Sequence, residues 1–376
     1  MSGQAPVRRQ APGKLFIAGE YAVLEPGHPA ILVAVDREVS VTVSAADGAD
    51  VVIESDLATG QARLRRRDGV LTAFDGGGGE RPAPDSLGHV VSAIEVVDGL
   101  LAARGLRHAP VHVAITSRLH VDGTKFGLGS SGAVTVATVS ALAAYHGVDL
   151  APEERFRLAL LATARLDPGA SGGDLAASVW GGWIAYQAPN RAAVLDMARR
   201  LGVDEAVRAP WPGFALHRLP PPRALALEVG WTGQPASTSS LTGQLEARRW
   251  RGSAAHRGFV ARSDECVRSA IRALEQGDDH DLVRQVRAAR QVLAGLDGEV
   301  GLGIFTSRLT ALCDAAEAAG GAAKPSGAGG GDCGIALLDA TADERITRMR
   351  ARWAAAGVQP MPIHVQATNE TIAGSR

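Results

Sequence analysis

The sequence has few of the features that assign a protein to a class at once. Its 376 residues include only three cysteines, Cys266, Cys313 and Cys333. An odd number at wide spacing predicts reduced thiols in a cytoplasmic protein, not a disulfide framework. The histidines show no spacing typical of zinc ligands. No run of 18 apolar residues occurs, and the opening MSGQAPVRRQAPGK lacks the apolar region of a signal peptide, so we expect no membrane partner.

An excess of charge of either sign is also lacking. The formal net charge is −1 at pH 7, which predicts no general attraction to nucleic acid or to an anionic membrane. Any positive potential must therefore be local. The length and the hydrophobic content of 46% predict a large core and allow two domains. Nothing in the sequence indicates an oligomeric state.

Lysine is the scarcest charged residue. Only three of the 39 basic residues are lysines, and Lys14, Lys125 and Lys324 each lie in a glycine-containing motif. Arginine serves elsewhere, so lysine is expected where a compact ammonium fits and a planar guanidinium does not. This distribution predicts a site that handles phosphate, with chance and structural lysines as the alternative.

Hydrophobic periodicity predicts an α+β protein of two domains, 1–190 and 191–376, with a boundary near 190–222. The 75–85 segment (DGGGGERPAPD) is expected to be a loop, and Asp85 or Ser86 is expected to cap the helix that follows. Predicted strands lie within 14–45, where 31–35 is an apolar run and 38–43 alternates, and at 51–54, 62–66, 111–119, 181–186, 225–231, 334–338 and 361–365. Predicted helices are 85–104, 130–146, 152–166, 250–275, 279–294, 305–319 and 343–356.

The sharpest motif is the run GLGSSG, which leads directly into the predicted helix at 130–146. Glycines let the backbone approach a ligand closely, and a helix N-terminus offers unpaired N–H donors and partial positive charge. The two serines can offer hydroxyls to a phosphate or to Mg²⁺. A close-packed core helix is the structural alternative. The motif residues are Gly127, Leu128, Gly129, Ser130, Ser131 and Gly132.

Two further segments carry candidate chemistry. In ASGGDLAAS a single acid, Asp174, lies among small residues at a predicted helix start, either as an N-cap or as a group that orients an acceptor oxygen or takes its proton. The glycine-rich stretch from Lys324 to Gly334 lies between a strong helix and an apolar strand. A backbone cradle that closes over a ligand explains it better than a flexible loop does.

These segments, in this order, resemble the GHMP kinase superfamily from residue 12 to about residue 338. APGKLFIAGEYAVL, GLGSSGA and PSGAGGGDCGIAL resemble its three motifs. KFGLGSSGAVT, GWTGQPAST and SGGDLAASVWGG are closest to the phosphomevalonate kinase branch. The resemblance implies an N-terminal domain like domain 2 of ribosomal protein S5 and a ferredoxin-like C-terminal domain, with ATP and substrate between them.

The resemblance also implies roles for individual residues. Lys14, Lys125 and Asp174 would be catalytic, and the motif from Gly127 to Gly132 would hold the ATP phosphates, with Ser131 contacting Mg²⁺. The residues implied to bind the substrate are Lys14, Ser171, Asp174, Ser237, Thr238, Gly327, Ala328 and Gly329. Mevalonate kinases carry a metal-binding Glu on the preceding helix, but the segment 160–165 (LLATAR) has no acid.

The expected activity is transfer of the ATP γ-phosphoryl group to (R)-5-phosphomevalonate, giving (R)-5-diphosphomevalonate and ADP in the mevalonate route to isoprenoids. The expected partners are ATP, Mg²⁺ and this small-molecule substrate. The alternatives are a GHMP kinase that acts on an alcohol such as mevalonate or a sugar, diphosphomevalonate decarboxylase, and a relative that binds ligand without catalysis. Arg287 and Arg290 face either the substrate or solvent.

Overall fold

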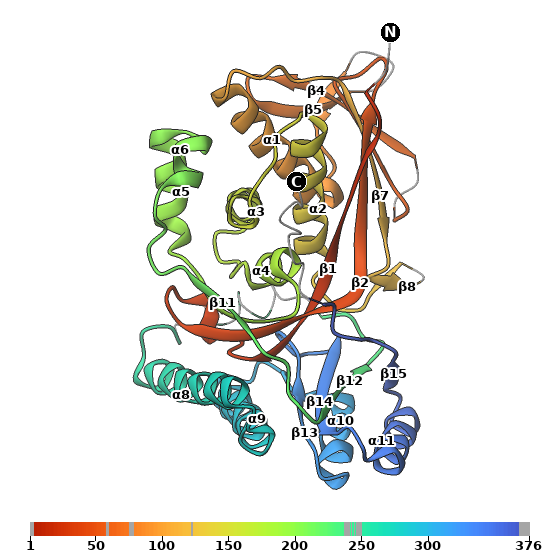
Figure 1. The fold of residues 1–376 in the computed structure, drawn as a ribbon, viewed down its shortest axis with the longest axis vertical. Coiled ribbons are helices and arrows are strands. Elements are labelled where there is room, and N and C mark those ends of the chain that lie inside the picture. The colour runs from red at the N-terminus through yellow and green to blue at the C-terminus, as the bar shows by residue number, and fades with distance from the viewer. Residues whose placement is uncertain are drawn as a thin grey trace, which may run out of the picture.

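Two β-sheets organise the chain. The computed structural model describes residues 4–57, 60–74, 79–121, 123–236, 241, 243, 245 and 250–367. Within these ranges the strands form a nine-stranded sheet, a four-stranded sheet and a two-stranded hairpin. Helices α1–α6 lie beside the large sheet, and α10 and α11 lie on the small one (Figure 1). This arrangement confirms the predicted α+β class.

The large sheet is antiparallel throughout except where β3 pairs with β7. β1 and β2 form its longest pair, and their register shifts between Pro12 and Lys14. The irregularity releases the Lys14 N–H from the ladder, and it donates to Leu128 O at 2.8 Å. In spatial order the strands are β11 (Ala215–Leu219), β10 (Trp183–Gln187), β2 (Pro29–Ala45), β7 (Val111–Ser117), β3 (Val51–Ser55), β4 (Gln61–Arg67), β5 (Val70–Phe74) and β6 (Glu80–Pro82), with β1 (Val7–Ala18) also paired to β2.

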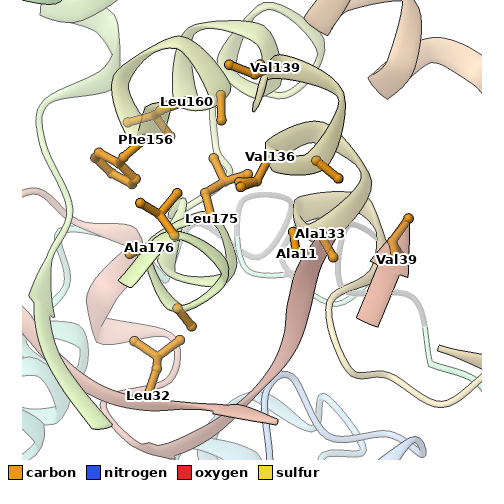
Figure 2. Packing of buried hydrophobic residues seen from close by; sticks show 14 of the residues in the cluster. Ala11, Leu32, Val39, Ala133, Val136, Val139, Phe156, Leu160, Leu175 and Ala176 are labelled. Atoms are coloured by element: carbon orange, nitrogen blue, oxygen red, sulfur yellow. The ribbon is translucent and has the colours of Figure 1, made fainter. Parts of the chain in front are cut away.

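Four helices fill the space over the inner face of β1 and β2. α2 is composed mainly of small and β-branched residues, so it approaches the two strands closely. Figure 2 shows Val136 of α2, Leu160 of α3 and Leu175 of α4 directed toward one another in this core. The helices are α1 (Gly88–Ala103), α2 (Ser130–Tyr145), α3 (Pro152–Leu166) and α4 (Gly173–Trp180), and α5 (Arg191–Leu201) and α6 (Val203–Arg208) pack outside them.

The small sheet is fully antiparallel in the order β13-β14-β12-β15. The chain leaves the large sheet at Leu219 and enters the small one at Leu225. α8 and α9 pack against each other and reach the end of β1, which joins the two halves. The elements are β12 (Leu225–Trp231), β13 (Ala322–Pro325), β14 (Cys333–Asp339), β15 (Gln359–Met361), α8 (Ala254–Gln276), α9 (Asp279–Val300), α10 (Ser307–Ala318) and α11 (Asp343–Ala355).

Three short elements complete the described chain. β8 (His120–Val121) and β9 (Thr124–Lys125) form a hairpin before α2, and the 3-10 turns η1 (Ala22–Leu24) and η2 (Asp85–Leu87) follow β1 and precede α1. Together η2 and α1 make a helical stretch that is long and apolar enough, by composition, to cross a bilayer. Its apolar side chains are buried, and α1 packs against α2 and α3, so it is a core helix here.

Several predicted elements need correction. The expected loop at 75–85 contains β6, which pairs with β5, while residues 75–78 lie outside the described chain. Neither Asp85 nor Ser86 caps the following helix, because η2 intervenes and α1 begins at Gly88. The last strand was predicted over 361–365, but β15 spans Gln359–Met361, and Val365 forms only an isolated bridge with Val35. Elements β5, β11, β13, α5 and α6 were not predicted, and neither was the hairpin of β8 and β9.

Candidate active site

The glycine turn before α2 has the geometry of an anion-binding site. Gly127 and Gly129 adopt φ of 81° and 77°, a region that side chains disfavour. The first α-helical bond runs from Ala133 N to Gly129 O, so the N–H groups of the preceding residues have no partner within the helix. No side chain of the described residues caps this end. The N-terminus of α2 therefore offers donors and positive potential to a ligand.

Lys14 lies where three of the sequence motifs meet. Its side chain is 9% exposed, and its Nζ donates to Gly127 O at 3.3 Å. A Cβ placed on Gly327 would lie 3.7 Å from the same Nζ. The ammonium of β1 thus lies between the glycine turn of α2 and the glycine-rich loop before β14. This position suits contact with an anion held by both loops.

Asp174 faces the same turn from the first turn of α4. Its Oδ1 accepts from Leu175 N at 3.0 Å, and a Cβ on Gly132 would lie only 2.5 Å from its Oδ2. A Cβ on Gly129 would lie 3.1 Å from Lys14 Cγ and 3.2 Å from Asp174 Cβ. Gly129 therefore lies between the side chains of Lys14 and Asp174, and Gly132 leaves the space that the Asp174 carboxylate occupies. Asp174 is not the N-cap of α4, because Gly172 occupies that position.

The loop before α4 is held in place by local hydrogen bonds. Ser171 Oγ accepts from Gly173 N at 3.3 Å, and Ser171 O accepts from the Tyr186 hydroxyl at 2.6 Å. Burial raises the pKa of Tyr186, which keeps its proton for that bond. Ser171 lies three residues before Asp174 in this ordered loop, and its side chain is half-buried.

The three lysines do not share one environment. Lys125 is exposed on β9, at the rim of the site, where its charge acts on Asp332 and His89. Lys324 is fully buried, forms an ion pair with Glu20, and donates to Pro325 O at 2.7 Å. The expectation that all three lysines handle phosphate is therefore wrong for Lys324, which joins the end of β1 to β13.

The glycine-rich loop is tied to β1 and its following turn. Ser326 Oγ accepts from Phe16 N at 2.8 Å, and the Tyr21 hydroxyl donates to Ala328 O at 2.5 Å. Gly329 has φ of 73°, and a Cβ there would lie 2.5 Å from Ile304. These contacts fix the loop from Gly327 to Gly329, and Gly327 lies beside Lys14.

Two residues that the sequence did not single out also face the site. Asp332, in the glycine-rich loop, packs its carboxylate against Gly127. Burial raises the pKa of Asp332, while the hydrogen bond from Ala236 N–H and the charge of Lys14 oppose the shift. Burial lowers the pKa of His89, in the first turn of α1, while the nearby Asp174 opposes the shift. The imidazole is therefore neutral at pH 7. The sequence feature that could have identified Asp332 is an acidic residue within a glycine-rich run.

Some sequence candidates lie elsewhere. Ser237 and Thr238 fall outside the described residues. The described segment that precedes them in the sequence is 232–236. Arg290 pairs with Asp314 at 2.7 Å and with Glu317 at 2.6 Å, and Arg287 donates to Gly321 O at 2.8 Å. These two arginines join α9 to α10 and the turn before β13, and do not line the site.

The site favours anions and hard cations. The described residues contain no cluster of three acidic, histidine or cysteine side chains that could hold a metal alone. Asp174, which lies against Gly132, and the hydroxyl of the preceding Ser131 are oxygen ligands, the type that Mg²⁺ prefers when phosphate and water complete its shell. The thiols take no part, since all three cysteines are buried and burial raises the pKa of Cys266 to about 11.

Comparison with known proteins supplies the chemical context. The model of the GHMP kinases N terminal domain matches residues 89–182, and that of the GHMP kinases C terminal matches residues 270–355. The chain is 63% identical to a phosphomevalonate kinase of Streptomyces sp. (strain CL190), over 96% of this chain and 98% of that one. A mevalonate kinase of Thermococcus sibiricus is 27% identical over 92% of each chain.

A solved structure agrees with these sequence matches. The Streptococcus pneumoniae phosphomevalonate kinase in complex with phosphomevalonate and AMPPNP superposes with a TM-score of 0.82 at 28% identity, covering 96% of this chain and 99% of that one. The two chains therefore share their fold over nearly their whole length.

Proposed function

The chain belongs to the GHMP kinase family, and on that premise we propose that it transfers the γ-phosphoryl group of ATP to (R)-5-phosphomevalonate, releasing (R)-5-diphosphomevalonate and ADP. The observation that carries the proposal is the convergence on Lys14 of the Gly127 turn and the Gly327 loop, together with the 63% identity to a phosphomevalonate kinase. The reaction belongs to the mevalonate route to isoprenoids.

In this proposal the N-terminus of α2 binds the phosphates of ATP. The residues from Gly127 to Gly132 supply backbone N–H groups and two hydroxyls, and the helix dipole adds positive potential. Catalysis of phosphoryl transfer depends mainly on positioning the reactants and on stabilising the charge of the transferred group. Lys14, held between two loops, meets both demands, and Lys125 supplies a second ammonium at the rim.

The acceptor is already an anion, which sets the role of Asp174. A phosphomonoester has a second pKa of about 6, so its oxygen is mostly ionised at pH 7. That oxygen attacks the γ-phosphorus while the bond to the ADP oxygen breaks. Asp174 then has no proton to remove, and its task is to hold Lys14 and the acceptor in line. Ser171, Ser237, Thr238 and the loop from Gly327 to Gly329 complete the acceptor site in this proposal.

Mg²⁺ fits the oxygen donors of this site. Ser131 and Asp174 are the side chains proposed to hold it, and it would neutralise charge on the phosphates when bound. The absence of an acid in 160–165 leaves most of its coordination to phosphate oxygens and water. We further propose a cytoplasmic location, where ATP is supplied, and an N-terminal ATP-binding domain over 1–190 followed by a C-terminal domain over 191–376.

Substrate choice tests the proposal. Release of ADP is measured with ATP, Mg²⁺ and either mevalonate, (R)-5-phosphomevalonate or (R)-5-diphosphomevalonate, and CO₂ is monitored. Turnover is expected with phosphomevalonate alone and without CO₂. Equal kcat/KM with mevalonate would indicate an alcohol kinase, and CO₂ released from diphosphomevalonate would indicate a decarboxylase.

The Asp174→Asn variant tests the assignment of roles, because it keeps the shape of the side chain and removes its charge. Its kcat should fall, and its dependence on pH between about 6 and 9 should stay as shallow as that of the parent. A unit-slope rise of log kcat with pH, seen only in the variant, would show that Asp174 had removed a proton and that the acceptor is a hydroxyl.

A further inference from the structure

Asp332 occupies a backbone position where glycine would be the easier choice. Its φ is 51°, in the left-handed region, and it follows three consecutive glycines. Glycine adopts this region freely, whereas Asp does so at some cost. The chain keeps a carboxylate here although the three residues before it have no side chain. The side chain is therefore expected to do something that glycine cannot.

The contacts of Asp332 reach one segment in particular, residues 232–236, which continues from β12. The Asp332 main-chain N–H donates to Gln234 O at 2.7 Å, and its carbonyl accepts from Thr232 N at 2.9 Å. The carboxylate Oδ1 accepts from Ala236 N at 3.0 Å. Since the pairing of β12 with β14 ends at Trp231 and Cys333, these bonds set the course of the segment beyond the sheet.

The same carboxylate packs on the phosphate-binding turn. A Cβ on Gly127 would lie 2.3 Å from Asp332 Cβ and 2.6 Å from its Oδ2, so the side chain occupies the space that Gly127 leaves. Gly127 O in turn accepts from Lys14 Nζ. Burial raises the pKa of Asp332, and the positive charges of Lys14 and Lys125 oppose that shift. One side chain thus links the 232–236 segment to the turn proposed to hold the ATP phosphates.

We infer that Asp332 is a positioning residue for the acceptor. It fixes the 232–236 segment against the Gly127 turn, whose carbonyl oxygen accepts from Lys14 Nζ, and so sets the place of Lys14 and of the acceptor relative to the phosphoryl group of ATP. This inference rests on the proposed function. It requires a side-chain oxygen at position 332 that can accept a hydrogen bond. It does not require direct contact between Asp332 and either substrate.

Three variants separate this role from a contribution to folding. Asp332→Gly removes the carboxylate and relieves the backbone strain, so it should fold at least as well as the parent. Asp332→Asn keeps an oxygen that can accept from Ala236 N and tolerates positive φ. Asp339→Ala, at the exposed far end of β14, is the matched control, and it lies outside the site.

Steady-state kinetics and melting temperature should be measured on all four proteins. For Asp332→Gly, kcat/KM with (R)-5-phosphomevalonate should fall about 10²-fold, the effect expected of a misplacement near 1 Å, with KM for ATP changed far less. Asp332→Asn should regain most of the loss, and Asp339→Ala should match the parent. Parent-like kinetics in Asp332→Gly, or equal losses in the Gly and Asn variants, would overturn the inference.

Hydrogen exchange provides a readout that does not depend on the substrate. In the ligand-free protein, the Ala236 amide should exchange faster in Asp332→Gly than in the parent, and at the parental rate in Asp332→Asn. Unchanged exchange in Asp332→Gly would contradict the inference. If instead the parent fails to use phosphomevalonate while exchange responds as expected, the proposed function is wrong and the link through Asp332 stands.

Discussion

Replacing Gly132 by alanine tests the arrangement of the site through a single methyl group. Gly132 lies in the first turn of α2, and a Cβ there would lie 2.5 Å from Asp174 Oδ2 and 2.6 Å from its Cγ. Ordinary van der Waals contact begins at 3.4 Å, so the carboxylate must retreat by about 1 Å. A misplacement of that size in a catalytic group costs roughly 10²-fold in rate, or about 2.7 kcal/mol of transition-state stabilisation.

The same substitution has an opposite effect on the helix itself. Alanine is favoured over glycine inside a helix by about 1 kcal/mol, which offsets part of the steric cost. The melting temperature of Gly132→Ala should therefore change little while kcat falls. Gly295→Ala is the matched control, because Gly295 lies in α9 and a Cβ there would meet nothing within 4 Å. It should raise the melting temperature slightly and leave kcat unchanged.

The assay is ADP release at saturating ATP and (R)-5-phosphomevalonate, paired with thermal melts of the same preparations. A Gly132→Ala enzyme with kcat within about threefold of the parent would refute the reasoning, because a side chain displaced by about 1 Å would then have no effect. A parallel fall of kcat in Gly295→Ala would also refute it, since that change lies away from the site.

Three further predictions concern single side chains. Ser131→Ala should lower kcat by about 10²–10³, as loss of one charge-stabilising donor does, and near-parental kcat would show that the serine serves only the helix. Lys14→Arg and Lys125→Arg should each lower kcat strongly at unchanged melting temperature, because guanidinium is bulkier and differently hydrated; full activity in both would reduce the lysine pattern to coincidence. Lys324→Met should destabilise the fold by about 3–5 kcal/mol, because Glu20 is then left charged and unpaired. Adding Glu20→Gln to the same chain should restore part of the lost stability. An unchanged denaturant midpoint for Lys324→Met would contradict the buried pair.

The local features of this protein could be predicted from the sequence. α3, α8, α9 and α11 have clear hydrophobic periodicity and start near their predicted positions. The glycine turn before α2 was predicted because positive φ and close approach both demand glycine. α5 and α6 were missed because they are short, with 11 and 6 residues, and lie in a stretch that contains several prolines; contacts with α3 stabilise them.

The roles of the candidate site residues stay a prediction. Lys14 and Asp174 were expected to flank the acceptor, and their side chains lie on either side of Gly129. The burial of Lys324 was not predictable, since only the fold brings Glu20 to it across 304 residues. The position of Asp332 against Gly127 is likewise a long-range contact. Glycine motifs indicate where a backbone approaches a ligand, but they do not show which distant side chain fills the space.

Phosphorus NMR of the reaction mixture tests the central claim most directly. The protein is incubated with ATP, Mg²⁺ and (R)-5-phosphomevalonate, and the ³¹P resonances are followed with time. The account predicts loss of the phosphomonoester signal with equal growth of ADP and a new diphosphate ester, and no inorganic phosphate. Persistence of the phosphomonoester while ATP is hydrolysed to ADP and inorganic phosphate, or conversion of mevalonate under the same conditions, would contradict it.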